Sequence, residues 1–317
     1  MRSNLYCTTV SKEYVMDARI SNLAQIASLR RYHLMGGAQD GLEVIDCDNG
    51  KLRFLVNVSK ACDIMQLYHE GQNVSFISKN GFTKREIPFL NRFEGGMLYT
   101  CGLDNAGRRE GYEMHGSFHN TPAEILRAEC NEGGIVIEAL IRNSALFGQS
   151  LVMKRRITSA IGDTHLVLED TLYNEGYADA EYCLLYHINV GYPMLDEGAR
   201  ILTDATEFYA RAPFAVENAA TRYEMSDAIP NQPECCYYLT MKEPKATLVN
   251  EKLGKAFTLS YSADTLPFFL EWKSMASKDY ALGLEPCTTM LDSAFTYKTV
   301  APGGSVAFRV DICVDTI

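Results

Sequence analysis

The feature that most constrains the fold is a rhythm of short segments in which apolar and polar residues alternate. In one of them Leu166, Leu168 and Leu172 fall on the same face of an extended chain. Comparable segments recur over residues 52–58, 135–142, 151–157, 166–173, 182–190, 257–261, 268–273 and 306–314, and Gly- and Asn-containing turn signals at 131–134, 161–164 and 174–176 separate several of them. Short strands of this kind, with few helical interruptions, are typical of an antiparallel sandwich or barrel. The sequence therefore predicts an all-β fold.

One segment departs from this rhythm. In residues 17–34, Ile20, Leu23 and Ile26 recur at helical spacing and a Gly36-Gly37 pair follows as a stop signal, which predicts a helix. A chain of 317 residues can form one domain or two. Because no Gly/Ser/Pro-rich linker or internal repeat divides it, we predict a single β-sandwich domain over residues 1–317, with residues 1–40 as a helical N-terminal extension packed on it.

Charge and cysteine content limit the partners and the compartment. Thirty Lys and Arg against 40 Asp and Glu give a net charge of −10, which argues against nucleic acid or an anionic membrane as a partner but leaves an acidic small molecule open. The ten cysteines are scattered, several in apolar segments, where a reduced thiol acts as a small hydrophobe. No leader-like apolar stretch opens the chain and no apolar run approaches the roughly 20 residues of a membrane span. We expect a cytoplasmic protein.

Three of the six histidines lie in contexts that suit a functional site. In the predicted strand 182–190, Leu184, Tyr186 and Ile188 share one face, so that His187 and Asn189 share the opposite one, which in a curved sheet can line a cleft. His115 and His119 lie in a Gly- and Pro-punctuated stretch over residues 111–123.

A divalent-metal site is one interpretation of the two loop histidines. The pair His115 and His119, together with Glu113 or His187, offers metal-binding groups. Gly116 and Pro122, however, disfavour the helical geometry that such a spacing needs, and we predict no metal ligand. For each histidine taken alone, the alternative is a hydrogen-bonded structural residue.

Glu285 is the carboxylate whose sequence context best suits acid–base chemistry. Apolar residues flank it and Pro286 follows, so that partial desolvation is expected to raise its pKa toward that of a general base. The alternative is a structural glutamate bonded to backbone amides. The single Trp272 lies on the preceding predicted strand and suits the apolar face of a sugar, whereas Arg92 offers a planar fork of donors.

Other chemistries lack their motifs. The sequence has no GxSxG, no P-loop and no GxGxxG after a strand. Cys101 and Cys287 remain possible nucleophiles in principle, but neither has a neighbouring motif that assigns it a base.

Several blocks, taken together and in order, resemble a known family. They are Phe-Glu-Gly-Gly-Met-Leu-Tyr-Thr-Cys-Gly-Leu-Asp-Asn at 93–105, Met-His-Gly at 114–116, Thr-Pro-Ala at 121–123, Tyr-His-Ile-Asn-Val-Gly-Tyr-Pro at 186–193, Trp-Lys at 272–273 and Leu-Gly-Leu-Glu-Pro-Cys-Thr at 282–288, with a weaker Cys-Asp-Ile at 62–64 before Tyr68 and Gly71. This order is similar to that of the aldose 1-epimerase-like proteins, and more narrowly to their branch labelled as a domain of unknown function, DUF4432. The resemblance extends over residues 60–290.

The resemblance implies a galactose-mutarotase-like β-supersandwich that binds a sugar between two histidines and a glutamate. It implies Glu285 as the general base, His187 as the general acid and His115 as the second histidine, acting without a cofactor or metal. Further substrate contacts are then expected among polar and aromatic residues in or beside these blocks: Arg92, His119, Asp63, Asn189, Trp272 and Lys273. The acid histidine of mutarotases usually stands in an Asn-His pair followed by an aromatic residue and Asn, and this chain departs from that pattern with Tyr186-His187-Ile188-Asn189.

Two other functions remain open at this point. One is a carbohydrate-binding or sensing protein, which a separation of more than about 8 Å between His187 and Glu285 would favour, because one anomeric centre could not then contact both groups. The other is a sugar isomerase or epimerase that abstracts a carbon-bound proton. A homodimer, formed through a sandwich edge or the N-terminal segment, is compatible with either.

Overall fold

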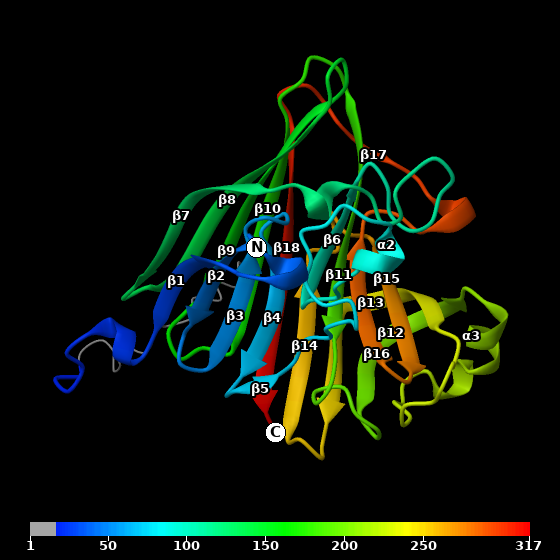
Figure 1. The fold of residues 1–317 in the computed structure, drawn as a ribbon. Helices are drawn as coiled ribbons and strands as arrows, with labels where there is room; N and C mark the ends of the chain where they lie inside the picture. The colour runs from blue at the N-terminus through cyan, green and yellow to red at the C-terminus, as the bar shows by residue number, and fades with distance from the viewer. Residues whose placement is uncertain (1–16) are drawn as a thin grey trace, which may run out of the picture.

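A computed structural model describes residues 17–317, which form two antiparallel sheets, as Figure 1 shows. The smaller sheet has the order β1-β2-β3-β4-β5 and contains β1 (Ser28–His33), β2 (Glu43–Asp48), β3 (Leu52–Asn57), β4 (Asp63–His69) and β5 (Gln72–Asn73). In Figure 1 this sheet, drawn in blue, lies in front of the green strands β8 to β10 of the larger sheet. The all-β prediction is confirmed.

The larger sheet has 13 strands, in the order β17-β11-β16-β15-β13-β14-β18-β10-β9-β8-β7, with β12 paired to β13 and β6 paired to β11. Its members are β6 (Leu98–Leu103), β7 (Ala123–Asn131), β8 (Gly134–Ser144), β9 (Ser150–Ser159), β10 (His165–Asn174), β11 (Ala180–Val190), β12 (Arg200–Ala210), β13 (Cys235–Asn250), β14 (Lys255–Tyr261), β15 (Phe268–Ala276), β16 (Asp279–Cys287), β17 (Lys298–Val300) and β18 (Ser305–Thr316). Each segment for which the alternation predicts a strand lies in one of the observed strands, to within a residue at its ends.

The helix predicted over residues 17–34 is wrong. The structure has there only a 3-10 turn, η1 (Leu23–Gln25), which Asn22 caps, and then strand β1. β1 pairs with β2 along its whole length, and Leu29 packs against the main core while Tyr32 packs against a small cluster on the other face. The sheet edge therefore decides the conformation, because pairing with β2 satisfies the backbone and buries the alternate apolar side chains. Residues 1–16 of the predicted N-terminal extension lie outside the described residues.

The remaining helical elements are short. They are α2 (Phe89–Arg92), α3 (Pro213–Glu217), and the 3-10 turns η2 (Gly37–Gln39), η3 (Phe118–Asn120), η4 (Ala219–Thr221) and η5 (Asp292–Ala294). Among residues 17–317, no helix has the length and apolar character needed to cross a membrane. The elements that carry the site are thus strands and the loops between them.

The main core lies between the two sheets and draws buried side chains from both. Leu184, Tyr186 and Ile188 of β11 belong to it, as the alternation predicts. The opposite face of β11 carries Cys183 and Leu185, which pack in a second cluster with Phe89 and Tyr99. Because successive side chains on a strand point to opposite faces, His187 shares this second face.

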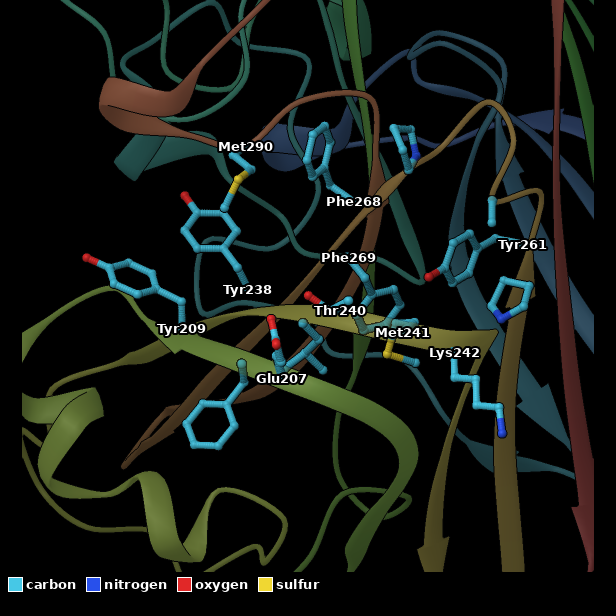
Figure 2. Close-up of a pocket in the computed structure, with 15 residues that line it drawn as sticks. Glu207, Tyr209, Tyr238, Thr240, Met241, Lys242, Tyr261, Phe268, Phe269 and Met290 are labelled. Carbon is cyan, nitrogen blue, oxygen red and sulfur yellow. The ribbon is translucent and has the colours of Figure 1, made fainter.

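Strand β13 changes its partner along its length. Its first residues pair with β15 through Leu239, and its last ones pair with β14 from Lys245 onward. A groove opens at the change of partner, and Figure 2 shows the aromatic side chains that line it.

The cysteines of the described chain are all free, and all but Cys130 are buried. This agrees with the expectation of reduced thiols in the core.

Candidate active site

Two neighbouring central strands place His187 beside Glu285. The register of β11 against β16 pairs Leu185 with Cys287 and Ile188 with Leu284, which puts His187 opposite Glu285 on the second face. The His187 Nε2 and Glu285 Oε1 atoms are 3.2 Å apart. Both side chains are almost fully buried, at 5% and 2% exposure. Neighbouring strands of one sheet therefore hold the His187–Glu285 pair.

Gly283 makes room for this carboxylate. A Cβ atom at residue 283 would overlap Glu285 Oε1 and would lie 3.1 Å from the Trp272 Cβ. Gly283 and Trp272 are cross-strand partners in the β15–β16 ladder. The absence of a side chain at Gly283 thus lets Trp272 and Glu285 share one small space.

His115 reaches the site from the loop between β6 and β7. Its own φ is 62°, and Gly116 follows with a φ of 77° and with backbone oxygens of Gly102 and Asn105 packed where a side chain would stand. The His115 Nδ1 accepts a hydrogen bond from the Gly107 amide at 3.3 Å. That bond leaves the proton of the neutral imidazole on Nε2, so that His115 can donate to a ligand. Its ring meets that of His187 edge-on, with centroids 5.5 Å apart.

These groups line a cavity of about 500 Å³. Its wall includes the aromatic side chains of Phe76, Phe89, Phe93 and Trp272, and its many polar lining residues include Arg211 and Glu234. The Trp272 indole donates to Glu234 Oε2 at 2.7 Å, which fixes the ring 5.4 Å from that of His187. Aromatic side chains together with convergent polar groups are typical of a small-molecule site.

Burial shifts the pKa of each ionisable group at the centre. Desolvation raises the pKa of Glu285 to about 8, helped by the nearby charge of Glu234. Desolvation lowers the pKa of His187 to about 3, and that of His115 to about 4 with a further contribution from the Arg211 cation. A water-excluded site favours the neutral form of every group. At neutral pH the free site therefore holds a protonated Glu285 beside a neutral His187.

Two atoms of this pair form no well-aligned hydrogen bond within the described part of the protein. Among the described residues, Glu285 Oε1 and His187 Nδ1 are buried and accept or donate no hydrogen bond. Buried polar atoms are nearly always bonded, and each exception needs an explanation. Atoms of this kind beside a cavity are suited to receive the hydroxyl groups of a ligand.

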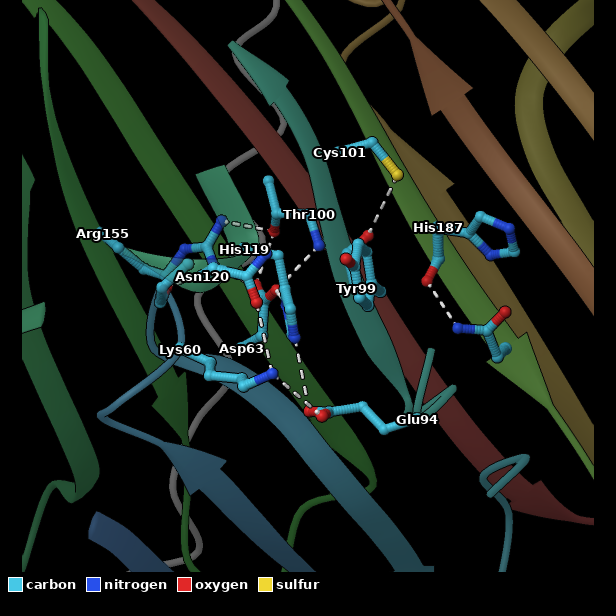
Figure 3. Close-up of polar contacts among 12 residues, drawn as sticks. Lys60, Asp63, Glu94, Tyr99, Thr100, Cys101, His119, Asn120, Arg155 and His187 are labelled. Atoms are coloured by element: carbon cyan, nitrogen blue, oxygen red, sulfur yellow. Dashed lines mark hydrogen bonds and ion pairs between the residues drawn. The ribbon is translucent and has the colours of Figure 1, made fainter. Parts of the chain in front are cut away.

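Asp63 and His119 lie apart from the cavity, in a buried polar network that Figure 3 shows. His119 Nδ1 is 2.6 Å from Asp63 Oδ2 and its Nε2 is 3.3 Å from Glu94 Oε1. Asp63 also accepts from Thr100 and pairs with Arg155, which in turn binds Asp170. This network ties β4 of the small sheet to β9 and β10 of the large one, so that Asp63 and His119 serve the packing of the sheets and are not proposed as substrate contacts.

Tyr99 connects this network to the site. Its ring stacks on His119, with centroids 3.7 Å apart, and meets Phe93 of the cavity wall at 5.3 Å. Within residues 17–317, no three His, Cys, Asp or Glu side chains are arranged to hold a metal ion.

Three further residues named from the sequence have other partners. The Lys273 ammonium donates to the backbone oxygens of Thr221, Arg222 and Glu224, at 2.9–3.3 Å. Arg92 pairs with Glu113 at 3.0 Å and lines a shallower hollow with α2. Asn189 donates to the His187 backbone oxygen at 2.9 Å, so that it supports the strand that carries His187. Trp272 alone of the predicted substrate contacts lines the cavity beside the three central residues.

Arg211 is a site residue that the sequence reading missed. It follows β12, and its Nη2 donates to Asp292 Oδ1 at 2.6 Å while its Nε bonds the other carboxylate oxygen. Neither Arg211 nor Glu234 stands in a recognisable motif, because both reach the cavity only through the pairing of β12 and β15 with β13. Gly283 lies in the block at 282–288 that contains Glu285, but its role in making room for the carboxylate depends on its cross-strand neighbour Trp272.

The fold and site together define a β-sandwich protein with a buried carboxyl–imidazole pair in a small-molecule cavity. A family model described as a domain of unknown function, DUF4432, matches residues 39–308, and the chain belongs to that family. No match was found among curated proteins.

Solved structures share the fold. A "putative aldose 1-epimerase" from Klebsiella pneumoniae subsp. pneumoniae is 20% identical and superposes with a TM-score of 0.82, covering 92% of this chain and 86% of the other. A galactose mutarotase-like protein from Clostridium acetobutylicum is 13% identical, with a TM-score of 0.69 and coverage of 92% and 100%. A "putative mutarotase" from Salmonella typhimurium is 12% identical, with a TM-score of 0.65 and coverage of 94% and 96%. The mutarotase-like β-sandwich is thereby confirmed.

Proposed function

We propose that this protein is an aldose 1-epimerase, which interconverts the anomers of a sugar by opening and reclosing its ring. The observation that carries the proposal is the buried contact of 3.2 Å between His187 Nε2 and Glu285 Oε1 in the cavity. A carbohydrate-binding protein needs neither an acid nor a base at this place, whereas ring opening needs both. The names of the structural neighbours point in the same direction.

The reaction requires two proton transfers on one hemiacetal. Glu285, as carboxylate, takes the proton of the anomeric hydroxyl; the bond between the anomeric carbon and the ring oxygen breaks; and the ring oxygen takes a proton from the His187 imidazolium. Rotation about the C1–C2 bond then presents the other face of the carbonyl. Reclosure reverses both transfers, so that protons balance and no redox partner is needed. His115 donates its Nε2 proton to a substrate oxygen.

The pKa values of the pair suit this cycle. The starting form, carboxylate with imidazolium, contains the same number of protons as the neutral pair that burial favours in the free site. Hydroxyl groups of a bound sugar stabilise the carboxylate by donating to it. Ring opening then leaves a protonated Glu285 and a neutral His187. Desolvation therefore favours the protonation state that Glu285 and His187 have when the sugar ring is open. Each of the two groups is expected to accelerate the reaction by about 10²–10⁴-fold.

The proposal is tested by proton NMR of free aldoses, following the exchange between their anomeric signals. The wild-type protein is expected to accelerate exchange of at least one sugar, and Glu285→Gln is expected to lower the rate by about 10²–10⁴-fold. Asp279→Asn is the matched control, because it alters a carboxylate that lines the same cavity, pairs with the exposed Lys79 and lies outside the proposed proton transfers. A Glu285→Gln protein as fast as wild type would overturn the assignment.

Two further readouts keep the test decisive. Glu285→Gln is expected to fold, because burial already favours a neutral side chain at this position and the amide is neutral. The melting temperature of the variant is measured in parallel to check this. Incorporation of solvent deuterium into carbon positions of the sugar would replace the proposal by an epimerase acting on a C–H bond, since ring opening leaves all such bonds intact.

A further inference from the structure

A second cavity, an aromatic groove of about 420 Å³, opens where β13 changes from β15 to β14. Figure 2 shows Tyr209 and Tyr238 on one side of it, with Tyr261 and Phe269 on the other. Each pair of rings is nearly parallel, with interplanar angles of 23° and 22° and centroids 6.3 and 5.4 Å apart. Tyr209 is 65% exposed, so that a broad aromatic face meets solvent.

The groove combines these rings with polar groups at its margin. Glu207, Thr240 and Lys242 line it beside the tyrosines. Flat aromatic faces with hydrogen-bonding groups around them fit ligands that present an apolar C–H face and a rim of hydroxyls, which is the surface of a pyranose ring. Glu207 and Lys242 carry opposite charges, so the groove offers no net attraction to an ion of either sign.

The groove adjoins the active-site cavity along three segments. On β12, Tyr209 lines the groove, and Arg211, two residues later and just past the end of the strand, lines the cavity. On β13, Tyr238 lines the groove, and Cys236, two residues earlier, lines the cavity. Positions i and i+2 of a strand share a face and are about 6.8 Å apart. Met290 lines the groove and Leu291 the cavity, and the Leu291 amide donates to the Tyr238 hydroxyl at 3.0 Å.

We propose that the groove binds the second sugar unit of a reducing oligosaccharide whose reducing end occupies the cavity at Glu285 and His187. The proposal rests on the function proposed above and names its substrate class. The ligand would cross from the cavity to the groove over Arg211, whose guanidinium Asp292 holds in place. A monosaccharide would fill only the cavity and make no contact with Tyr209.

The test compares glucose and galactose with the reducing disaccharides maltose, cellobiose and lactose. Anomer exchange is measured by NMR for wild type, for Tyr209→Ala, and for Tyr177→Ala, which removes a fully exposed tyrosine of another loop, between β10 and β11. For at least one disaccharide we expect wild type to show a kcat/KM higher than for its component monosaccharides. We expect Tyr209→Ala to lose about tenfold on that disaccharide and less than twofold on monosaccharides, and Tyr177→Ala to change neither.

Binding separates this proposal from the activity itself. Trp272, the single tryptophan, lines the cavity, so that its fluorescence reports occupancy there, while saturation-transfer NMR reports contact with the tyrosines. If no sugar is turned over but a disaccharide binds wild type more tightly than Tyr209→Ala, the aldose 1-epimerase proposal fails and the groove stands. If no disaccharide is preferred over its monosaccharides in binding or turnover, or if Tyr209→Ala changes neither, the groove proposal is overturned.

Discussion

At the scale of single residues, burial determines which groups of the site are protonated. Glu285 and His187 are the two groups that a reader of the sequence can select, because an isolated carboxylate among apolar residues and a histidine opposite a core face both signal desolvation. The structure adds the contact between them and the tautomer of His115. The contact depends on the pairing of β11 with β16, and the tautomer depends on the Gly107 amide of the same loop; the sequence pattern reveals neither.

The pH dependence of the rate follows from the shared proton. Above the raised pKa of Glu285, at about 8, the free site loses the proton that His187 must donate to the ring oxygen. The lowered pKa of His187 places uptake of a second proton near pH 3. We expect kcat/KM for anomer exchange to stay level from about pH 5 to 7 and to fall tenfold per pH unit well above 8. Polarimetry with a freshly dissolved single anomer measures it, and a rate that stays level to pH 10 would contradict the shared-proton account.

Asp63, His119 and Lys273 show where residue-by-residue reading fails. Each lies in or near a family-like block, yet each is occupied by a buried partner: Asp63 by Arg155, His119 by Asp63 and Glu94, and Lys273 by three backbone oxygens. A polar side chain on a strand lies on one of two faces of the sheet. Only the register with the neighbouring strands determines whether it contacts a cavity or forms an ion pair in the interior.

At the scale of elements, the pairing of β11, β15 and β16 builds the site. The alternating pattern predicts β11 and β15, but it predicts neither β16 nor the order of the three strands, since β16 lies between two strands that are distant from each other in the chain. The error over residues 17–34 has the same origin. An apolar spacing of three residues fits one face of a helix, and pairing with β2 turned Ser28–His33 into an edge strand instead.

Gly283 is the position where this pairing is least tolerant of change. A methyl group at Gly283 would overlap the Glu285 carboxylate and crowd Trp272. We expect Gly283→Ala to lower the rate of anomer exchange by more than tenfold, since displacement of the reacting carboxylate by about 1 Å can cost about 10²-fold. We expect overpacking to lower stability by about 1–3 kcal/mol.

Gly133→Ala, in the turn between β7 and β8, is the control for this substitution. The nearest atom to its added Cβ is the movable side-chain oxygen of Asn131, at 3.2 Å. Rates and melting temperatures of both variants are compared with wild type. Full activity in a folded Gly283→Ala protein would show that Glu285 has more freedom than its packing indicates.

At the scale of the whole molecule, the two sheets are joined by an apolar core and by one buried ionic network. Arg155 is fully buried and binds Asp63 of the small sheet and Asp170 of the large sheet. The Arg155 charge lowers the pKa of Asp63 against its desolvation, with hydrogen bonds from His119 and Thr100 acting in the same sense. A lowered carboxyl pKa contributes stability that is present above the unfolded-state pKa, near 4, and is lost as the pH falls through the folded-state pKa.

Removal of Arg155 tests whether this network holds the sheets together. Arg155→Met keeps the length and apolar stem of the side chain but leaves two buried carboxylates without their cation, which typically costs about 3–5 kcal/mol. For a chain of this size, that corresponds to a fall in melting temperature of roughly 5–8 °C at pH 7. Because protonation of the carboxylates relieves the unpaired charge, we expect the difference from wild type to shrink as the pH is lowered toward 4.

Arg142→Met is the control, since it removes an exposed arginine paired with exposed Glu175 and should change stability by less than about 1 kcal/mol. Differential scanning calorimetry of the three proteins between pH 4 and 8 tests this. Equal melting temperatures for wild type and Arg155→Met would mean that the network adds no stability, and a difference that grows on acidification would assign the loss to something other than the unpaired carboxylates.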